Sequence, residues 1–316
     1  MEKRPISRVS VGLPVYNGAD YLEEALDSLL DQTFEDFELI ISDNASTDGT
    51  EAICRAYALC DARIRYMRST TNRGAAANYN LVLETARGEY FRWAAHDDKI
   101  APEFLLACVQ ALDSDPEIVL AYARVTHIDA NGDCIENYES GFNLEAPSAV
   151  DRFRQFFNAP YKCTPVFGLM RTDVIRRTNR HGNYIGADRI LLGQLSLFGK
   201  FHEIPQYLFF RRIHPQISTE ANKNSRDLAA WFDPANRRKI LLPLWKHVVE
   251  YQKVILGAPI SPKEKMQCLA IMLRNQLPPR RWPALGKELV GGALQGLARL
   301  LPVRRYPARQ KSVGRG

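Results

Sequence analysis

The sequence has little that would place it among zinc-binding, disulfide-stapled or membrane-spanning proteins. It contains six cysteines, but no two of them form a CxxC pair, so the spacing indicates neither a metal site nor a disulfide framework. No run of about twenty apolar residues is present, which argues against a helix that spans a bilayer. We find no signal peptide before the first predicted strand, no internal repeat and no low-complexity segment. We therefore expect free thiols and a cytoplasmic location.

The composition is that of an ordinary globular enzyme. Of the 316 residues, 46% are hydrophobic and 25% are charged, which allows one large domain or two smaller ones. The net charge of +6 is unevenly distributed, because residues 274–316 contain ten Lys or Arg and a single acid and so carry +9, which leaves −3 for the remainder. The basic character therefore belongs to the C-terminal tail. We expect no nucleic acid among the partners.

Short apolar runs alternate with segments of helical periodicity in the first half of the chain. The apolar runs predict strands at Val9–Val15, Phe37–Ser42, Arg63–Met67, Tyr90–Ala95 and Ile118–Tyr122. Helices are predicted to start between them, near Asp20, Ser46, Gly74 and Pro102, and Asp20 with Glu23 predicts a capping box. This alternation is typical of an α/β fold with a doubly wound, mostly parallel sheet flanked by helices.

The second half is predicted to lose its strands towards the C-terminus. The patterns there predict a turn at His127–Asp133, a helix at Ala149–Phe157, a strand at Val166–Met170, a helix at Asp188–Phe198 and a strand at Phe201–Arg211. After Ser218 the strand pattern stops, and Leu228–Leu256 and Ser261–Gln276 are predicted to be helices. We interpret this last part as a helical extension packed on the sheet.

Polar residues follow several of the predicted strands. Asn17, Asp43, Asn44, Arg73 and Asp97 all lie just past a strand or in its connecting loop. Ligands of doubly wound sheets bind beyond the carboxyl ends of the strands, so this convergence predicts a nucleotide site. Asp97 and the adjacent Asp98 could hold a divalent cation together with substrate phosphates. The alternative is a solvated turn that caps the helix near Pro102.

Four ordered motifs resemble those of family 2 glycosyltransferases. They are Val11-Gly-Leu-Pro-Val-Tyr-Asn17, Ser42-Asp-Asn-Ala-Ser-Thr-Asp-Gly-Thr50, Asn72-Arg-Gly74 and His96-Asp-Asp98. The resemblance covers about residues 8–215 and implies the GT-A fold. It also implies inverting transfer of a sugar from a nucleotide-diphosphate sugar, with a UDP-sugar as first candidate. The acceptor would be a hydroxyl of a saccharide or glycolipid in cell-surface polysaccharide biosynthesis.

The same resemblance implies which residues bind the nucleotide sugar. Pro14, Val15, Tyr16 and Asn17 would line the base and ribose. Asp43 and Asn44 would contact the base, with Asn44 standing where the family commonly has a second acid; an amide offers both a donor and an acceptor there. Arg73 would lie near the base or diphosphate, unless it is an ordinary surface arginine. His96 could contact the donor or ribose, whereas Trp93 is more simply explained by buried packing.

The metal and the general base are also placed by the resemblance. Of the family's Asp-x-Asp motif only the last acid, Asp97, remains, because Ala95 occupies the first position. Asp97 would bind Mg²⁺ or Mn²⁺, with Asp98 and His214 as further candidate ligands; His214 could equally be a loop residue. Asp188 would be the base that deprotonates the acceptor hydroxyl, and its alternative role is a helix N-cap.

These predictions divide the chain into a catalytic domain and an extension. Residues 1–218 would form the catalytic domain, with a nucleotide-sugar half at 1–125 and an acceptor half at 126–218, and residues 219–316 a helical extension with a basic tail. An apolar face at Ala284–Leu301 next to Arg304, Arg305, Arg309, Lys311 and Arg315 could lie on an anionic membrane surface, or the helix could dock on the protein. Two other functions remain open: a non-catalytic nucleotide-binding scaffold with a decayed metal motif, and a sugar-nucleotide pyrophosphorylase.

Overall fold

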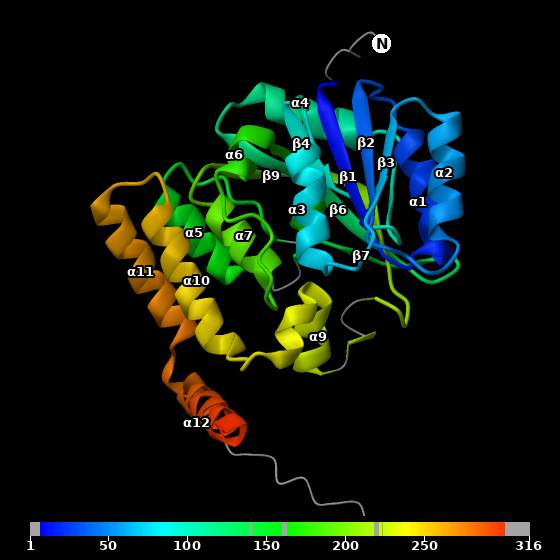
Figure 1. The fold of residues 1–316 in the computed structure, drawn as a ribbon. Coiled ribbons are helices and arrows are strands. Elements are labelled where there is room, and N and C mark those ends of the chain that lie inside the picture. The colour runs from blue at the N-terminus through cyan, green and yellow to red at the C-terminus, as the bar shows by residue number, and fades with distance from the viewer. Residues whose placement is uncertain (1–6, 140, 160–162, 218–220, 223, 301–316) are drawn as a thin grey trace, which may run out of the picture.

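The protein is built on a nine-stranded sheet with helices packed against it (Figure 1). The computed structural model describes residues 7–139, 141–159, 163–217, 221–222 and 224–300. The strands are β1 Val9–Val15, β2 Phe37–Asp43, β3 Ile64–Arg68, β4 Tyr90–Trp93, β5 Lys99–Ile100, β6 Ile118–Ile128, β7 Cys134–Tyr138, β8 Leu169–Arg171 and β9 Lys200–Arg212.

Helices connect most of these strands and form the whole C-terminal part. The α-helices are α1 Ala19–Leu30, α2 Thr50–Cys60, α3 Ala75–Thr85, α4 Phe104–Ser114, α5 Ala149–Asn158, α6 Thr172–Arg176, α7 Ala187–Leu195, α9 Ser225–Phe232, α10 Pro243–Gly257, α11 Pro262–Gln276 and α12 Trp282–Leu300. Three 3₁₀ helices are η1 Thr164–Phe167, η2 Pro234–Arg238 and η3 Pro279–Arg281. No helix among the described residues is long and apolar enough to cross a membrane.

The sheet is parallel where the chain winds through β1 to β4 and mixed beyond. Its order is β3-β2-β1-β4-β8-β6-β9-β5, with β7 paired to β6. The long pairing of β6 with β9 is also parallel, while the antiparallel pairings of β8, β5 and β7 are short. The predicted α/β class with a mostly parallel sheet flanked by helices is therefore confirmed. The seven residues of β1 are buried on both faces, as expected for a central parallel strand.

Register brings the ends of the parallel strands to one edge. Val15 at the end of β1 pairs with Asp43 at the end of β2, and Gly12 pairs with Trp93 at the end of β4. The loops that follow β1, β2 and β4 therefore leave the sheet side by side. The predicted convergence of the polar motifs at one sheet edge follows from this arrangement.

The C-terminal helices share a hydrophobic core with the rest of the chain. Phe153 and Phe156 of α5 pack in one buried cluster with Tyr251 and Val254 of α10 and Met272 of α11. In Figure 1, α10 and α11 lie beside α5 and α7 at the left of the molecule. The division at residue 218 stays a prediction, but apolar contacts cross it extensively.

Two local predictions were wrong for identifiable reasons. The capping box at Asp20 is absent, because α1 begins after Gly18 with no side-chain cap, and the amide of Ala19 donates to Asp48 Oδ2 at 3.2 Å instead. The single helix predicted over 228–256 is divided into α9, η2 and α10. Pro234 and Pro243 start the second and third pieces, where a missing amide hydrogen is tolerated.

Two further elements differ in extent from their predictions. The region predicted as one strand at 166–170 is shared by η1 and the short β8. The strand predicted at 118–122 extends to Ile128, because it pairs with β9 along its length.

Candidate active site

A cleft of about 870 Å³ lies beyond the carboxyl ends of β1 and β4. Nine of the twelve predicted site residues line it: Pro14, Val15, Tyr16, Asn17, Asn44, His96, Asp97, Asp98 and Asp188. The side chains of Asp43, Arg73 and His214 are not part of its lining. The structure thus brings residues from β1, the loop after β4 and the start of α7 into one cavity.

Asp97 and His214 form a paired carboxylate and imidazole at the cleft. His214 Nε2 lies 3.1 Å from Asp97 Oδ2, and Tyr21 contacts the His214 ring edge-on with centroids 4.6 Å apart. The hydrogen bond to Asp97 raises the pKa of His214, although burial opposes it. Burial also raises the pKa of Asp97, but His96 and His214 outweigh it and lower that pKa overall. The pair is therefore an ionised carboxylate beside a readily protonated imidazole.

This pair fits a divalent cation only in part. Carboxylate oxygen and imidazole nitrogen are suitable ligands for Mn²⁺, and carboxylate oxygen for Mg²⁺. His214 would have to release its proton to bind the ion. No group of three or more Asp, Glu, His or Cys side chains within the described part of the chain is arranged to hold a metal. Diphosphate oxygens would therefore have to complete the coordination.

Asp98 differs sharply from its neighbour. Its carboxyl is buried, and Oδ1 accepts a hydrogen bond from the Arg212 amide at 2.9 Å. Burial, together with the charge of Asp97, raises the pKa of Asp98 to about 8. A carboxyl that is protonated at neutral pH suits a support for the loop better than a metal ligand.

Arg212 holds the Asp97 loop in place through hydrogen bonds. Its fully buried guanidinium donates to the carbonyl of Asp97 at 3.0 Å and pairs with Glu24 Oε2 at 2.8 Å. It also donates to the carbonyls of Asp129 and Ala130, at 3.2 and 2.9 Å. One side chain thus joins the Asp97 loop, α1 and the turn between β6 and β7. Sequence analysis did not identify this role, because it depends on contacts between segments far apart in the chain.

The two residues expected to contact a base are engaged in holding loops. Asp43 is buried beneath the cleft, and its Oδ2 accepts from Tyr66 Oη and Arg68 Nε, each at 3.0 Å. The side-chain Nδ2 of Asn44 donates to Asn72 Oδ1 at 3.0 Å and to a backbone carbonyl. The side-chain Oδ1 of Asn44 accepts from the backbone amide of Arg73 at 2.9 Å. An acid at position 44 could not make both kinds of bond.

The neighbouring polar residues have different positions relative to the cleft. Arg73 is exposed, with its side chain outside the cleft lining. Asn17 has a φ of 50° and accepts from the Thr47 amide at 2.8 Å, so it joins the first two motif loops. Gly18 lies directly against the His96 ring, where a Cβ would overlap it. Base recognition by Asp43, Asn44 and Arg73 stays a prediction.

Asp188 lies in the first turn of α7 and is not its N-cap. The cap is Gly186, which has a left-handed φ of 78° and no side-chain hydrogen bond. Asp188 Oδ1 accepts from the Arg189 amide at 2.8 Å, and the helix N-terminus favours its negative charge. Burial raises the pKa of Tyr79, and the charges of Asp97 and Asp188 add to that effect. Tyr79 lines the cleft together with both of these carboxylates.

One wall of the cleft comes from α9 and η2, which sequence analysis did not place in the site. Phe232 of α9 packs on Ala76 of α3 and Ala187 of α7. Asn183, just before α7, donates to Asp233 Oδ2 at 3.0 Å. Further lining residues that the sequence did not reveal are Tyr79, His181, Arg211, Leu228, Trp231 and Arg237. Only long-range packing brings these residues together.

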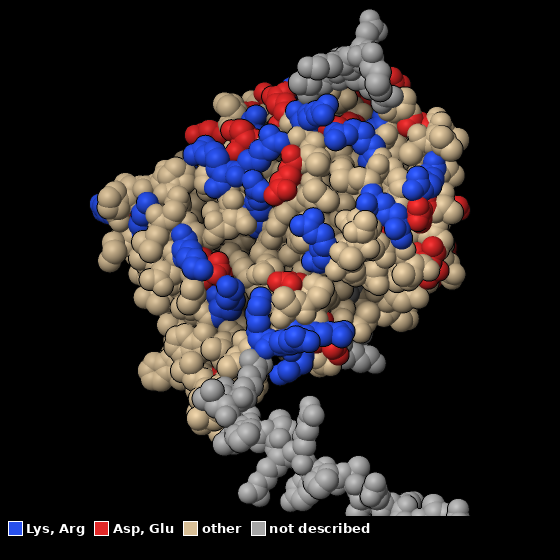
Figure 2. All heavy atoms as spheres, in the orientation of Figure 1, with Lys and Arg blue, Asp and Glu red and all other residues tan. Residues whose placement is uncertain are grey.

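The same segment adds positive charge to the rim. Figure 2 shows Lys and Arg side chains gathered over α9 and the segment after it. Exposed basic residues there are Arg226, Arg237, Arg238 and Lys239. Arg211 and Arg237 line the cleft itself, where they could offset the charge of an anionic ligand.

Comparisons with known proteins support one family. The chain is 36% identical over 122 residues to an uncharacterised glycosyltransferase of Rickettsia typhi, covering 38% of this chain and 37% of that protein. It is 28% identical over 230 residues to chondroitin synthase of Pasteurella multocida, covering 70% of this chain and 22% of that protein. The match therefore spans well under two thirds of either relative.

Solved structures show the same fold. Residues 1–349 of TarS from Staphylococcus aureus superpose with a TM-score of 0.63 at 20% identity, covering 93% of this chain and 79% of that one. TarS has also been solved with UDP and with UDP-GlcNAc. The model of the family described as Glycosyl transferase family 2 matches residues 10–178, more than half of the chain. This protein therefore belongs to glycosyl transferase family 2.

Proposed function

We propose that this protein is an inverting glycosyltransferase that uses a nucleotide-diphosphate sugar, with a UDP-sugar as the first candidate donor. It would transfer the sugar to a hydroxyl of a saccharide or glycolipid acceptor in cell-surface polysaccharide synthesis. One observation carries this proposal: Asp97, whose carboxylate is paired with His214, and Asp188 line the same cleft. The UDP complexes of TarS and the activity named for chondroitin synthase support the donor class and the kind of product.

The donor end of the cleft would be the region of Asp97. Pro14 to Asn17 form its wall next to the ends of the parallel strands, where a nucleoside would lie. Asp97 and His214 would hold Mg²⁺ or Mn²⁺ against the diphosphate. Such an ion supplies positive charge that stabilises the leaving nucleoside diphosphate. Arg211 and Arg237 would add to this stabilisation from the protein side.

The transfer itself needs only one displacement. The acceptor oxygen would attack the anomeric carbon as the bond from that carbon to the diphosphate oxygen breaks. Asp188 would take the proton of the attacking hydroxyl, and the electron pair of the broken bond would leave with the diphosphate. Attack from the face opposite the leaving group inverts the anomeric configuration. Asp188 can serve because its carboxylate lines the cleft and is not used as a helix cap.

Nucleotide binding and metal dependence test this proposal directly. A thermal-shift screen of UDP, GDP and CDP, each with and without Mn²⁺, should raise the melting temperature for one base, because a ligand that binds only the native state stabilises it. Transfer or donor hydrolysis should then require the cation. Asp97→Asn should lose most turnover, and the activity that remains should no longer require the cation. Asp36 is an exposed carboxylate before β2, and Asp36→Asn should behave like the parent.

Two results would contradict the proposal. A protein that binds no nucleoside diphosphate is not a nucleotide-sugar enzyme. One that binds the nucleotide but transfers nothing from any sugar donor would instead be a non-catalytic nucleotide-binding protein.

We also propose that α12 rests on an anionic membrane surface. Trp282, Val290, Leu294 and Leu297 are exposed at helical spacing on one side of α12. Leu285 is buried on the other side, where Glu288 accepts from the Leu244 amide at 3.0 Å. The helix is thus docked on the protein and still presents an apolar stripe, which is the arrangement an interfacial helix requires. The five basic residues at 304–315 lie outside the described residues.

Vesicle binding tests this location. Deleting residues 284–316 should reduce sedimentation with phosphatidylglycerol vesicles and leave binding to phosphatidylcholine vesicles equally low. Donor hydrolysis in solution should be retained. Equal sedimentation of the full-length and shortened proteins with anionic vesicles would show that α12 and the tail are not a membrane anchor.

A further inference from the structure

His181 forms a corner of the cleft that no motif predicted. Its side chain lines the cleft, and the residue is only 7% exposed. Within the described part of the chain, Nδ1 of its ring has no hydrogen-bond partner. Buried polar atoms in native proteins are nearly always paired, so an unpaired one in a cleft wall points to a partner that arrives with a ligand.

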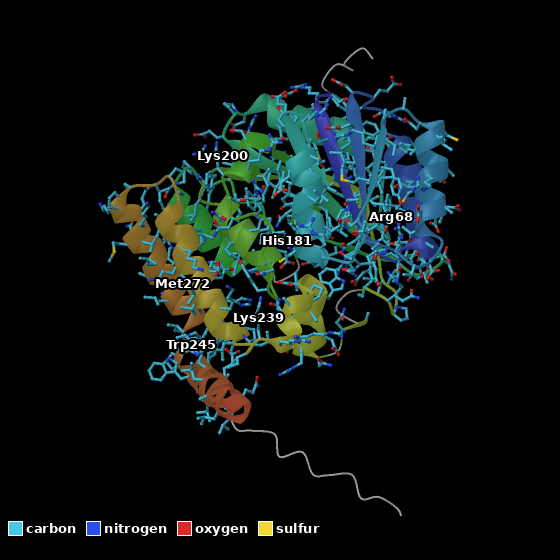
Figure 3. All side chains as sticks on the ribbon, in the orientation of Figure 1. Arg68, His181, Lys200, Lys239, Trp245 and Met272 are labelled. Carbon is cyan, nitrogen blue, oxygen red and sulfur yellow. The ribbon has the colours of Figure 1, made fainter. Side chains whose placement is uncertain are left out.

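The position of His181 is fixed by the protein. The amide of His181 donates to Asn80 Oδ1 at 3.0 Å, and Asn80 Nδ2 donates to the His181 carbonyl at 2.9 Å. The preceding Arg180 has a left-handed φ of 57°. Figure 3 shows His181 near the middle of the molecule, between α3, α7 and α9. The backbone of His181 is therefore held in place before any ligand binds.

Aromatic rings surround the imidazole. Tyr79 lies with its centroid 4.8 Å away and Phe232 stacks at 5.8 Å, and both line the cleft. Trp93 lies behind, fully buried, with its centroid 6.3 Å from His181 and its indole donating to the Tyr79 carbonyl at 2.9 Å. The packing expected for Trp93 is thus confirmed. A polar nitrogen between aromatic rings that line the cleft matches the alternation of hydroxyl and C–H groups on a sugar ring.

The charge state of His181 suits hydroxyl recognition. Burial lowers its pKa, and the nearby negative charge of Asp188 opposes that effect only in part. The neutral imidazole has one N–H donor and one acceptor nitrogen, so it can pair with a hydroxyl in either direction.

The corner also lies where the transferred sugar has to be. Its anomeric carbon is bonded to the diphosphate, which the proposed function places near Asp97, and is attacked by a hydroxyl whose proton goes to Asp188. Tyr79, whose ring centroid lies 4.8 Å from that of His181, lines the same cleft as Asp97 and Asp188. Resting on that function, we propose that His181 Nδ1 hydrogen-bonds a hydroxyl of the transferred sugar, while Tyr79 and Phe232 face its C–H groups. His181 is then a residue that determines donor-sugar specificity.

Three variants separate this role from packing. His181→Phe keeps an aromatic ring in the corner but removes both nitrogens. His181→Asn restores a polar group near the position of Nδ1. His202→Phe is the matched control, because His202 lies on β9 outside the cleft lining and pairs with Glu145 at 2.8 Å. Circular dichroism would confirm that each variant is folded.

Calorimetry would compare a nucleoside diphosphate with its nucleotide sugar, starting with UDP and UDP-GlcNAc. His181→Phe should bind UDP like the parent but bind the nucleotide sugar at least about tenfold more weakly, because a site built for a hydroxyl depends on that hydrogen bond. His181→Asn should recover part of the loss. A series of deoxy-sugar donors should contain one that binds the parent weakly and loses nothing further in His181→Phe, the signature of a shared contact.

The outcomes are distinguishable. If the parent binds no nucleotide sugar, the proposed function fails and this inference with it. If the parent binds but His181→Phe retains the parental ratio of the two affinities, only the role of His181 is overturned. Equal weakening of UDP and its sugar would also overturn it, because His181 would then act on the nucleotide or the fold.

Discussion

Asp97 and Asp98 are neighbours in the chain whose pKa values move in opposite directions. Asp97 faces His96 and His214, which lower its pKa against the effect of burial. Asp98 is buried beside the charge of Asp97, which raises its pKa to about 8. Both residues are aspartates in the same motif, so the sequence could predict a pair of acids here but not their different roles. That difference depends on Arg212 and His214, which approach from β9 and the residues after it.

Asp188→Asn tests the proposed base. The amide keeps the size of the side chain and can still accept from the Arg189 amide, so the variant should fold and bind nucleoside diphosphate normally. Its single-turnover transfer rate should fall by about 10²-fold or more, because an amide cannot take the proton. Transfer at the parental rate would exclude Asp188 as the base, whereas early melting together with lost nucleotide binding would show a structural role.

His181 should leave a signature in the pH dependence of stability. Burial lowers its pKa in the folded state, so the unfolded chain takes up a proton more readily as pH falls through the ordinary histidine range near 6.5. The free energy of unfolding is therefore highest above that range, and it decreases as pH falls from 7 to 5. Urea denaturation of the parent and His181→Phe should show a shallower decline for the variant, by at most about 1.4 kcal/mol per pH unit. Parallel profiles would contradict the lowered pKa.

Among the elements, α9 was the least predictable from sequence and shapes the cleft most. β1, β2, α5 and α11 were predicted closely, because their apolar periodicity is local and their ends are marked by turn residues. The break between α9 and α10 was missed, since an apolar run continued across Pro234 and Pro243. The contribution of α9 to the site depends on Phe232 packing on Ala76 and Ala187, which no local pattern reveals.

The variant Gly74→Ala tests how α9 is attached to the part of the protein that would bind the nucleotide. The φ of Gly74 is +84°, and a Cβ there would meet the Phe232 carbonyl and Pro234. Gly74→Ala should therefore lower the free energy of unfolding by about 1–3 kcal/mol and weaken nucleotide binding. Gly286→Ala is the matched control, because that position in α12 is open and alanine favours a helix. Urea denaturation would compare the two, and an unchanged Gly74→Ala would contradict the close contact.

At the scale of the whole molecule, the C-terminal helices belong to the core. Tyr251, Val254 and Ile255 of α10 are almost fully buried in the same cluster as Phe153 and Phe156. The sequence indicated a helical extension, but not that it covers the aromatic face of α5. Buried area of this kind follows from tertiary packing and leaves only a general amphipathic pattern in the chain.

Two truncations should therefore behave differently. A chain that ends at residue 218 should aggregate or stay unfolded, because the apolar face of α5 and α7 would be exposed. One that ends at residue 283 should fold, with a modest loss of stability from the bonds that Glu288 makes to the start of α10. Size-exclusion chromatography and circular dichroism would distinguish them. A folded, monomeric 1–218 fragment would show that the catalytic domain is independent after all.

The way α9 is attached also bears on how such a protein can change over evolutionary time. Phe232 and Ala229 anchor the helix, while Leu228 and Trp231 line the cleft and are only half buried, and Asp227 beside them is exposed. Substitutions at these three positions can alter what the cleft accepts without disturbing the sheet core. What the cleft binds can therefore diverge between members of the family while the strands and the Asp97 loop are inherited unchanged.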